Sequence, residues 1–373
     1  MNNESNFQPN WISVPGDTIS DILKERQIPL DEFASQLKCS TDYLNELLSG
    51  FTSITEEVAK KLELSLGISA EFWIKRQQQY VEDSIRLKKL EEKTWLDELP
   101  ISDMVNRGWI KKTNNLLTEC LNFFHVPDIN TWKQKYSETI AATTFRTSKS
   151  IKSNTGSISA WLRQGELIAS RMQCESWNEK LFEETLTKTI RPLTRIKEPK
   201  DFLPLLIKAC ADCGVAVVIL KTPSGCSASG ATKFINPQRA LLLLSFRYLS
   251  DDQFWFTFFH EAGHLILHGN KKVFIESVGL DINRTIEEKD ASTFAGEMLI
   301  PHDLQTRLKS LSGKWNIARF AELAGVSTGI VVGQMQFHNY IGAGTLNGFK
   351  RRYAWEDIIS NEGDSQSNQT SLF

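Results

Sequence analysis

The sequence predicts an α+β fold in which an all-helical N-terminal part, a helical middle region and a mixed C-terminal domain follow one another. Three observations support this class. Residues 17–86 carry apolar side chains at helical spacing, with short polar breaks between the runs. Residues 215–220 form a β-branched run of strand length. A strongly apolar helix with two histidines, residues 251–268, follows the predicted strands.

The bulk composition sets limits on the class of protein. A chain of 373 residues is long enough for two or three domains, and 41% hydrophobic with 24% charged residues is typical of a globular protein. The net charge of -2 gives no overall basic field, so nucleic acid would need a local patch. Residues 1–10 are polar, so we expect no secretion signal and a cytoplasmic protein with reduced thiols. No apolar stretch is long enough for a membrane span.

The first part, residues 1–86, is expected to be a domain of four or five short helices. Cys39 and Ser40 break the helical pattern, with Ser40 or Thr41 as the N-cap of the next helix, and Gly50 ends that helix. Two short helices joined by a tight turn inside such a unit are typical of a helix-turn-helix.

The second helix of this pair, residues 41–49, would read a DNA groove, with Thr41 and Asn45 as candidate contacts. It carries Asp42 and Glu46 and no lysine or arginine. DNA binding normally draws on cations that displace counterions from phosphate. Two interpretations therefore stay open: a DNA-binding module, or a helical module for dimerisation or partner binding. In the first, phosphate contacts would come from Lys24, Arg26, Lys60 and Lys61.

Three further parts are expected along the chain. Residues 87–200 form a helical middle region, and residues 201–345 form the C-terminal domain. Within that domain, strands at residues 215–220, 231–234 and 240–246 predict a small antiparallel sheet ahead of the histidine helix. The last part, residues 346–373, is rich in serine, glutamine and asparagine towards its end and is expected to be partly disordered.

The histidine helix carries the sequence His260-Glu261-Ala262-Gly263-His264. Residues four apart lie on one face of a helix, one turn apart, which is the geometry for two imidazoles on one tetrahedral zinc ion. Glu261 projects beside such an ion and could take a proton from an activated water. We expect Gly263 to relieve crowding where a substrate backbone would approach. The alternative is a buried helix with two hydrogen-bonded histidines.

A third protein ligand has to come from elsewhere, because a catalytic zinc keeps one position for water. A second helix is predicted from residue 286, and its apolar face begins at Ala291. Asp290 lies one position before that face and is the predicted third ligand, with Glu287 as the reserve candidate. For either carboxylate, the alternative is a solvated helix start, which the helix dipole favours.

These motifs resemble those of the ImmA/IrrE family of metallopeptidases, and the N-terminal helices resemble the HigA-like variety of the XRE helix-turn-helix fold. The first resemblance implies a zincin-like domain with Zn²⁺ held by His260 and His264, with Glu261 as the catalytic residue. It also implies a carboxylate ligand, usually Glu, at the position of Asp290. His268 also resembles the family, but we expect it to pack or to support a ligand, because a third imidazole one turn further along the helix would lie too far round to share the ion. The segments that carry the resemblances are residues 256–268, 290–295, 298–301, 229–232 and 329–334 for the peptidase, and 30–34, 44–50, 54–55, 59–62 and 71–73 for the helix-turn-helix.

The resemblance implies regulated cleavage of a repressor or antitoxin-like protein in a stress-response, toxin–antitoxin or phage-related system. The sequence thus predicts a zinc-dependent endopeptidase with a protein substrate, in which activity could be latent. The alternative is a DNA-binding transcriptional regulator or antitoxin whose metal domain serves for sensing or partner binding. A homodimer is compatible with both hypotheses.

Overall fold

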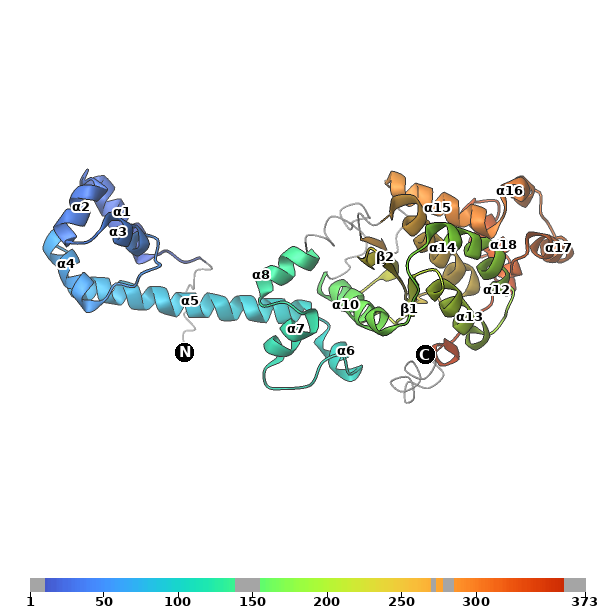
Figure 1. Ribbon diagram of the computed structural model, residues 1–373, viewed down its shortest axis with the longest axis horizontal. Coiled ribbons are helices and arrows are strands. Elements are labelled where there is room, and N and C mark those ends of the chain that lie inside the picture. The colour runs from blue at the N-terminus through green and yellow to red at the C-terminus, as the bar shows by residue number, and fades with distance from the viewer. Residues whose placement is uncertain (1–10, 138–154, 270–272, 278–284, 359–373) are drawn as a thin grey trace, which may run out of the picture. The chain divides into compact units, whose positions relative to one another are not determined.

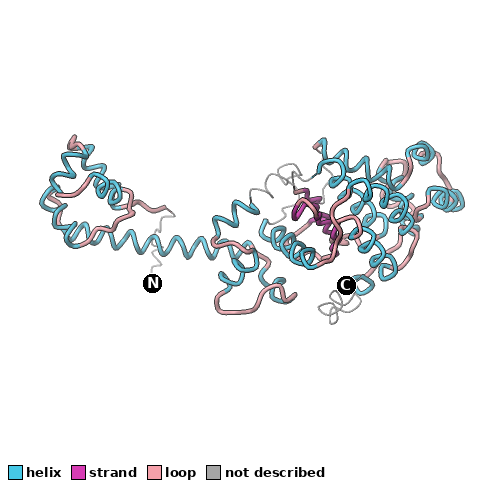
Figure 2. The backbone as a smooth tube through the Cα atoms, in the orientation of Figure 1, coloured by secondary structure: helices cyan, strands magenta, loops and turns pink. Residues whose placement is uncertain are grey.

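The computed structural model describes residues 11–137, 155–269, 273–277 and 285–358 of the chain. Helices and one small sheet together give the α+β class that the sequence predicts (Figures 1 and 2). The chain divides into two compact units, Met1–Trp95 and Leu96–Phe373. No helix in these described ranges combines the length and the apolar character that crossing a membrane requires.

The first unit is a small helical bundle. Ser40 caps the third helix, because its hydroxyl accepts a hydrogen bond from the backbone nitrogen of Tyr43 at 3.1 Å, and Thr55 caps the fourth through Val58. Ile19, Leu44 and other apolar side chains fill a core between the helices. The bounds are α1 (Pro15–Glu25), α2 (Leu30–Leu37), α3 (Thr41–Leu48), α4 (Glu56–Leu66) and α5 (Ala70–Glu98), the last of which ends beyond this unit.

The second unit begins with the helices that precede the sheet, of which α10 (Thr155–Arg171) and α13 (Pro199–Ala211) contact its strands. Helix α10 packs on one face of the sheet, where Gly165 lies against the side chain of Leu243. The composition of residues 143–159, rich in serine, threonine and lysine, predicts a loop or linker, but residues 155–159 belong to α10, and residues 143–154 lie outside the described residues. The bounds are α6 (Ile101–Asn106), α7 (Leu116–Phe124), α8 (Ile129–Trp132), η1 (Lys133–Ser137), α10 (Thr155–Arg171), α11 (Glu179–Thr185), η2 (Leu186–Ile190), α12 (Arg191–Leu193) and α13 (Pro199–Ala211).

The sheet has four strands in the order β1-β3-β2-β4: β1 (Val215–Ile219), β2 (Ala228–Asn236), β3 (Arg239–Leu244) and β4 (Phe274–Ser277). Strand β2 runs antiparallel to β3 and β4, but β1 and β3 are parallel. The expectation of an antiparallel sheet is therefore wrong for this pair. Both strands are continuous runs of buried residues, which is typical of parallel strands covered on both faces. Strand β4 is not among the strands that the sequence predicts.

Helix α14 (Asp251–His268) lies against β2 and β3 and carries the two histidines (Figure 1). Its opposite side contacts α15 (Ile286–Leu299) and α18 (Thr328–Phe337). Since the helix is enclosed in this way, its side chains from Phe258 to Leu265 are all buried. The remaining elements are α16 (His302–Leu308), α17 (Lys314–Ala324), η4 (Asn347–Phe349) and α19 (Trp355–Ile358).

The start of α14 is fastened by the chain's last described residues. Asp251 accepts hydrogen bonds from the hydroxyl of Ser327 at 2.7 Å and from the backbone nitrogen of Arg351 at 3.0 Å. Lys350 forms an ion pair with Asp252 at 2.6 Å. The guanidinium of Arg351 also donates to the carbonyl oxygens of residues 194–196. The predicted C-terminal segment is thus ordered through residue 358, and the rest of it lies outside the described residues.

Candidate metal centre

Helix α14 places the imidazoles of His260 and His264 on one face, one turn apart. The side chains are 2% and 1% exposed, and their Nε2 atoms lie 3.1 Å apart. The helix holds this spacing because it continues without a break from its N-cap, Ser250, to Gly269. The structure therefore brings the two histidines together, as their spacing in the sequence predicts.

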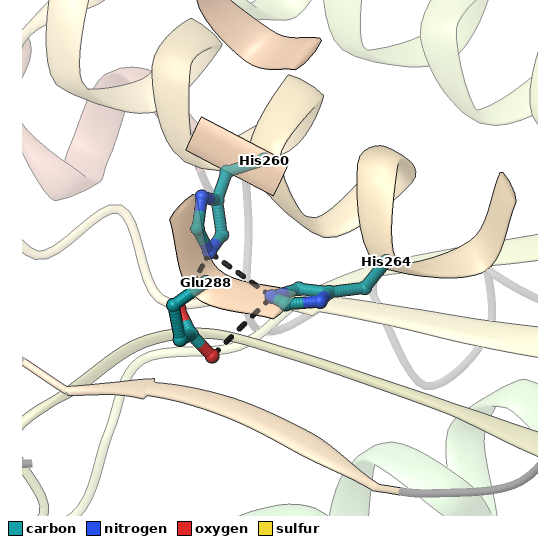
Figure 3. Close-up of side chains that lie close together, drawn as sticks. All are labelled: His260, His264 and Glu288. Atoms are coloured by element: carbon teal, nitrogen blue, oxygen red, sulfur yellow. Dashed lines mark hydrogen bonds and ion pairs between the residues drawn. The ribbon is translucent and has the colours of Figure 1, made fainter. Parts of the chain in front are cut away.

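Helix α15 supplies a carboxylate to the same point. The Oε2 atom of Glu288 lies 3.1 Å from Nε2 of His260, and its Oε1 atom lies 3.5 Å from Nε2 of His264. Figure 3 shows the three side chains converging from their two helices. Among the described residues, this is the group of histidine, cysteine and acidic side chains whose ligand atoms all lie within 4.8 Å of one another.

The structure brings Glu288, and not Asp290 or Glu287, to the histidines. Asp290 is exposed, and Glu287 is half-buried outside the group. The reason is which face of α15 is buried. Glu288 is three and four residues before the buried Ala291 and Ser292, and so shares their face, whereas a neighbouring residue points about 100° away. Continuing the buried stripe of α15 backwards by one turn would have indicated Glu288.

The charge states of the site suit a cation. Burial alone would raise the pKa of Glu288, but the hydrogen bonds and charges of His260 and His264 outweigh it, and the pKa of this carboxyl lies well below its ordinary value. Burial lowers the pKa of His264, which favours its neutral form, although the nearby Glu288 acts in the opposite direction. A carboxylate and a neutral imidazole are the forms in which these side chains bind metal ions.

The donor set fits one tetrahedral ion. Zinc–nitrogen and zinc–oxygen bonds of about 2.1 Å place the ligand atoms of a tetrahedron about 3.4 Å apart. The measured separations of 3.1 Å between the two nitrogens, and 3.1 and 3.5 Å from them to Glu288, lie close to that value. Two imidazoles and one carboxylate are also a ligand set that catalytic zinc sites use, with one position left for water.

Both imidazoles have partners at their second nitrogen. Nδ1 of His260 lies 3.3 Å from the hydroxyl of Ser292, and Nδ1 of His264 lies 3.2 Å from Nδ1 of His268. The ring of Phe274 stacks on His264 with 4.0 Å between ring centroids. Contacts of this kind orient metal ligands and fix their tautomers.

Glu261 is fully buried between α14 and strand β2, outside the group of three. A Cβ atom at Gly230 of β2 would lie 2.5 Å from Oε1 of Glu261, so glycine is required for this close approach. The backbone carbonyl of Glu261 accepts a hydrogen bond from Thr232 at 3.4 Å. Glu261 thus contributes a second buried carboxylate, which follows His260 in the chain and lies against β2.

Gly263 does not face the site, in contrast to the expectation that it makes room for a substrate backbone. A Cβ atom there would lie 3.0 Å from a ring carbon of Phe294 and 3.3 Å from Cα of Ala291. The glycine therefore permits the close approach of α15 to α14, and this approach is what brings Glu288 to the histidines.

The candidate DNA contacts lie on the first unit. Thr41 and Asn45 are both exposed on α3. Asp42 and Glu46 are exposed on the same helix, so the surface of α3 is acidic, as its sequence indicates.

Fold and site together define a protein with a helix-turn-helix module and an α+β domain that contains a candidate metal centre. Residues 213–334 match the IrrE N-terminal-like domain of the Peptidase_M78 family. The N-terminal region is similar to the uncharacterized HTH-type transcriptional regulator YddM of Escherichia coli (strain K12), with 35% identity over 63 residues, which cover 17% of this chain and 67% of that protein. The chain belongs to the HTH-type regulators through its N-terminal region and carries an M78 peptidase domain in its C-terminal half.

Proposed function

We propose that the C-terminal domain is a zinc-dependent endopeptidase in which His260, His264 and Glu288 hold the ion and Glu261 moves the proton. The observation that carries the proposal is the convergence of two buried imidazoles and one carboxylate, with a second, fully buried carboxylate on the residue that follows His260 in the same helix. The match to a peptidase family supports hydrolysis of a peptide bond as the reaction.

A zinc ion held by these residues would supply Lewis acidity, which polarises a peptide carbonyl and lowers the pKa of an attacking water. Glu261 accepts the proton that the water loses and passes it to the leaving amine. Gly230 and the surrounding helix–sheet contact fix the position of the Glu261 carboxylate. Glu288, held ionised by the two histidines, contributes a negative charge that favours the cation.

We propose a protein regulator as the substrate, either a repressor or an antitoxin-like protein, in a cytoplasmic stress-response, toxin–antitoxin or phage-related system. A helix-turn-helix module on the same chain supports this proposal, because such a module can bring a peptidase to a regulator or to the DNA that the regulator occupies. The product of the neighbouring gene is the first substrate to test.

The test compares three variants of the full chain for zinc content and for cleavage of that substrate. Glu261→Gln should keep its zinc and lose cleavage by about 10²–10⁴-fold, because it removes the proton acceptor alone. Glu288→Gln should lose zinc. Asp290→Asn is the matched control on the same helix and should keep both zinc and activity. Full activity of Glu261→Gln would refute the proposal.

The second candidate function is a DNA-binding regulator or antitoxin whose metal domain serves for sensing or partner binding. The similarity to an HTH-type transcriptional regulator favours it, and Thr41 and Asn45 are exposed where α3 would meet DNA. Binding to a fragment of the neighbouring promoter, weakened by salt and by Asn45→Ala, would support it. Salt-insensitive binding, or none, would leave the acidic α3 as a protein-binding surface.

A further inference from the structure

We propose that His268 and Phe274 are positioning residues that fix the tautomer and the ring orientation of His264 and thereby set how tightly the centre retains its ion. The inference rests on the metal centre proposed above, and assigns roles to two side chains outside the ligand set. Neither residue belongs to the group of three that could hold the ion.

Metal binding through Nε2 of His264 fixes the direction of the hydrogen bond between the two ring nitrogens. A neutral imidazole carries one N–H group, so Nε2 of His264 can bind an ion only when the proton is on Nδ1. That proton then points to Nδ1 of His268 at 3.2 Å, which has to accept it. His268 consequently carries its own proton on Nε2. With His268 as the acceptor, this hydrogen bond stabilises the one neutral form of His264 that leaves Nε2 available to a metal.

The ring orientation is set by strand β4. Phe274 lies nearly parallel to His264, with an angle of 13° between the ring planes and 4.0 Å between centroids. It is 7% exposed, and its backbone is paired with Thr232 of the neighbouring strand β2. The sheet therefore fixes the position of the Phe274 ring. The stacked phenyl ring in turn restrains rotation of the His264 side chain.

The two candidate histidine ligands are held by different contacts. His260 has its outer contact with Ser292 of α15, while His264 has its contacts with its own helix and with the sheet. Changes at His268 or Phe274 should therefore loosen one ligand and leave His260, Glu288 and the general base Glu261 in place. The expected consequence is weaker retention of the ion in a protein that still folds.

The first experiment measures zinc affinity by competition with a chromophoric chelator, using the full chain. His268→Leu keeps the approximate volume without an acceptor and should bind zinc about 10–100-fold more weakly. His268→Asn places an amide oxygen near the position of Nδ1 and should recover most of that loss. His302→Leu, at a histidine whose side chain is 86% exposed, is the control and should bind as the unmodified protein does.

The second experiment separates orientation from general packing. Phe274→Ala should release zinc faster and change the visible absorption spectrum of the Co²⁺-loaded protein, since the ligand geometry changes. Ile275→Ala removes a buried side chain from the next position of the same strand and should leave the spectrum unchanged.

Unchanged zinc affinity in both His268→Leu and Phe274→Ala would overturn the inference, as would equal losses in His268→Leu and His268→Asn. Equal effects of Phe274→Ala and Ile275→Ala would reduce the role of Phe274 to packing and contradict the inference for that residue. The proposed peptidase activity would survive these results, because it depends on the Glu261→Gln comparison and on zinc binding by the unmodified protein.

Discussion

The ion pair between Lys350 and Asp252 is one of the few charged contacts in the interior of the second unit. The two side chains are 8% and 3% exposed, and their charged atoms lie 2.6 Å apart. The other oxygen of Asp252 accepts a hydrogen bond from Ser250, and Lys350 also donates to Gln336. Removing one partner of a buried pair costs more than the pair contributes, because the remaining charge has neither a counterion nor water.

We therefore predict that Lys350→Met lowers the stability of the second unit by about 3–5 kcal/mol. The measurement is the unfolding temperature of the purified chain. Lys309→Met, at an exposed lysine, is the control and should change it little. A Lys350→Met variant that unfolds at the same temperature as the unmodified protein would show that the pair contributes no stability to the folded unit.

At the scale of elements, the contact between α14 and α15 decides whether a centre exists at all. Residues four apart on one helix keep their geometry wherever that helix packs, so the spacing of His260 and His264 was sufficient to predict their convergence. The third carboxylate could not be assigned in the same way. It depends on the rotation of α15 about its axis, which is set by the packing of Ala291 and Phe294 on Gly263. That contact is not encoded by either motif alone.

For the strands, too, local sequence determines where a strand forms, whereas distant contacts determine how it pairs. Residues 215–219 have the composition and length of a buried strand, and the structure has β1 there. The pairing of β1 with β3 joins segments separated by the whole of β2, and no local pattern specifies that order. Strand β4 is only four residues long, which is too short for a clear alternation.

A test at this scale uses the glycine at the helix contact. Gly263→Ala should improve the intrinsic stability of α14 by up to about 1 kcal/mol but push α15 outward, since the new methyl group meets Phe294 and the backbone of Ala291. We expect weaker zinc binding with no loss of unfolding temperature in the metal-free protein. Gly230→Ala should have the opposite effect. Its methyl group would displace Glu261, so zinc should stay bound while cleavage falls. Identical behaviour of the two variants would contradict these assignments.

At the scale of the whole molecule, ion binding should stabilise only one of the two compact units. The candidate ligands all belong to the second unit, and an ion that binds only the folded form stabilises that form. Removing the ion should therefore destabilise one unit and leave the other as it was.

Hydrogen exchange measured by mass spectrometry can resolve this difference along the full chain. After chelation we expect faster exchange in α14 and α15 and unchanged exchange in α1–α4, with recovery when zinc is added back. Uniform acceleration across both units would indicate that they unfold together. No change anywhere would mean that the centre does not bind zinc.

The attachment of Lys350 and Arg351 to the start of α14 also bears on how the peptidase domain should be expressed alone. The matched family region ends at residue 334, yet the backbone donor of Arg351 to Asp251 and the lysine paired with Asp252 come later in the chain. A recombinant fragment cut at residue 345 would remove both of these partners. Fragments meant for crystallisation or inhibitor screening should therefore extend to residue 358.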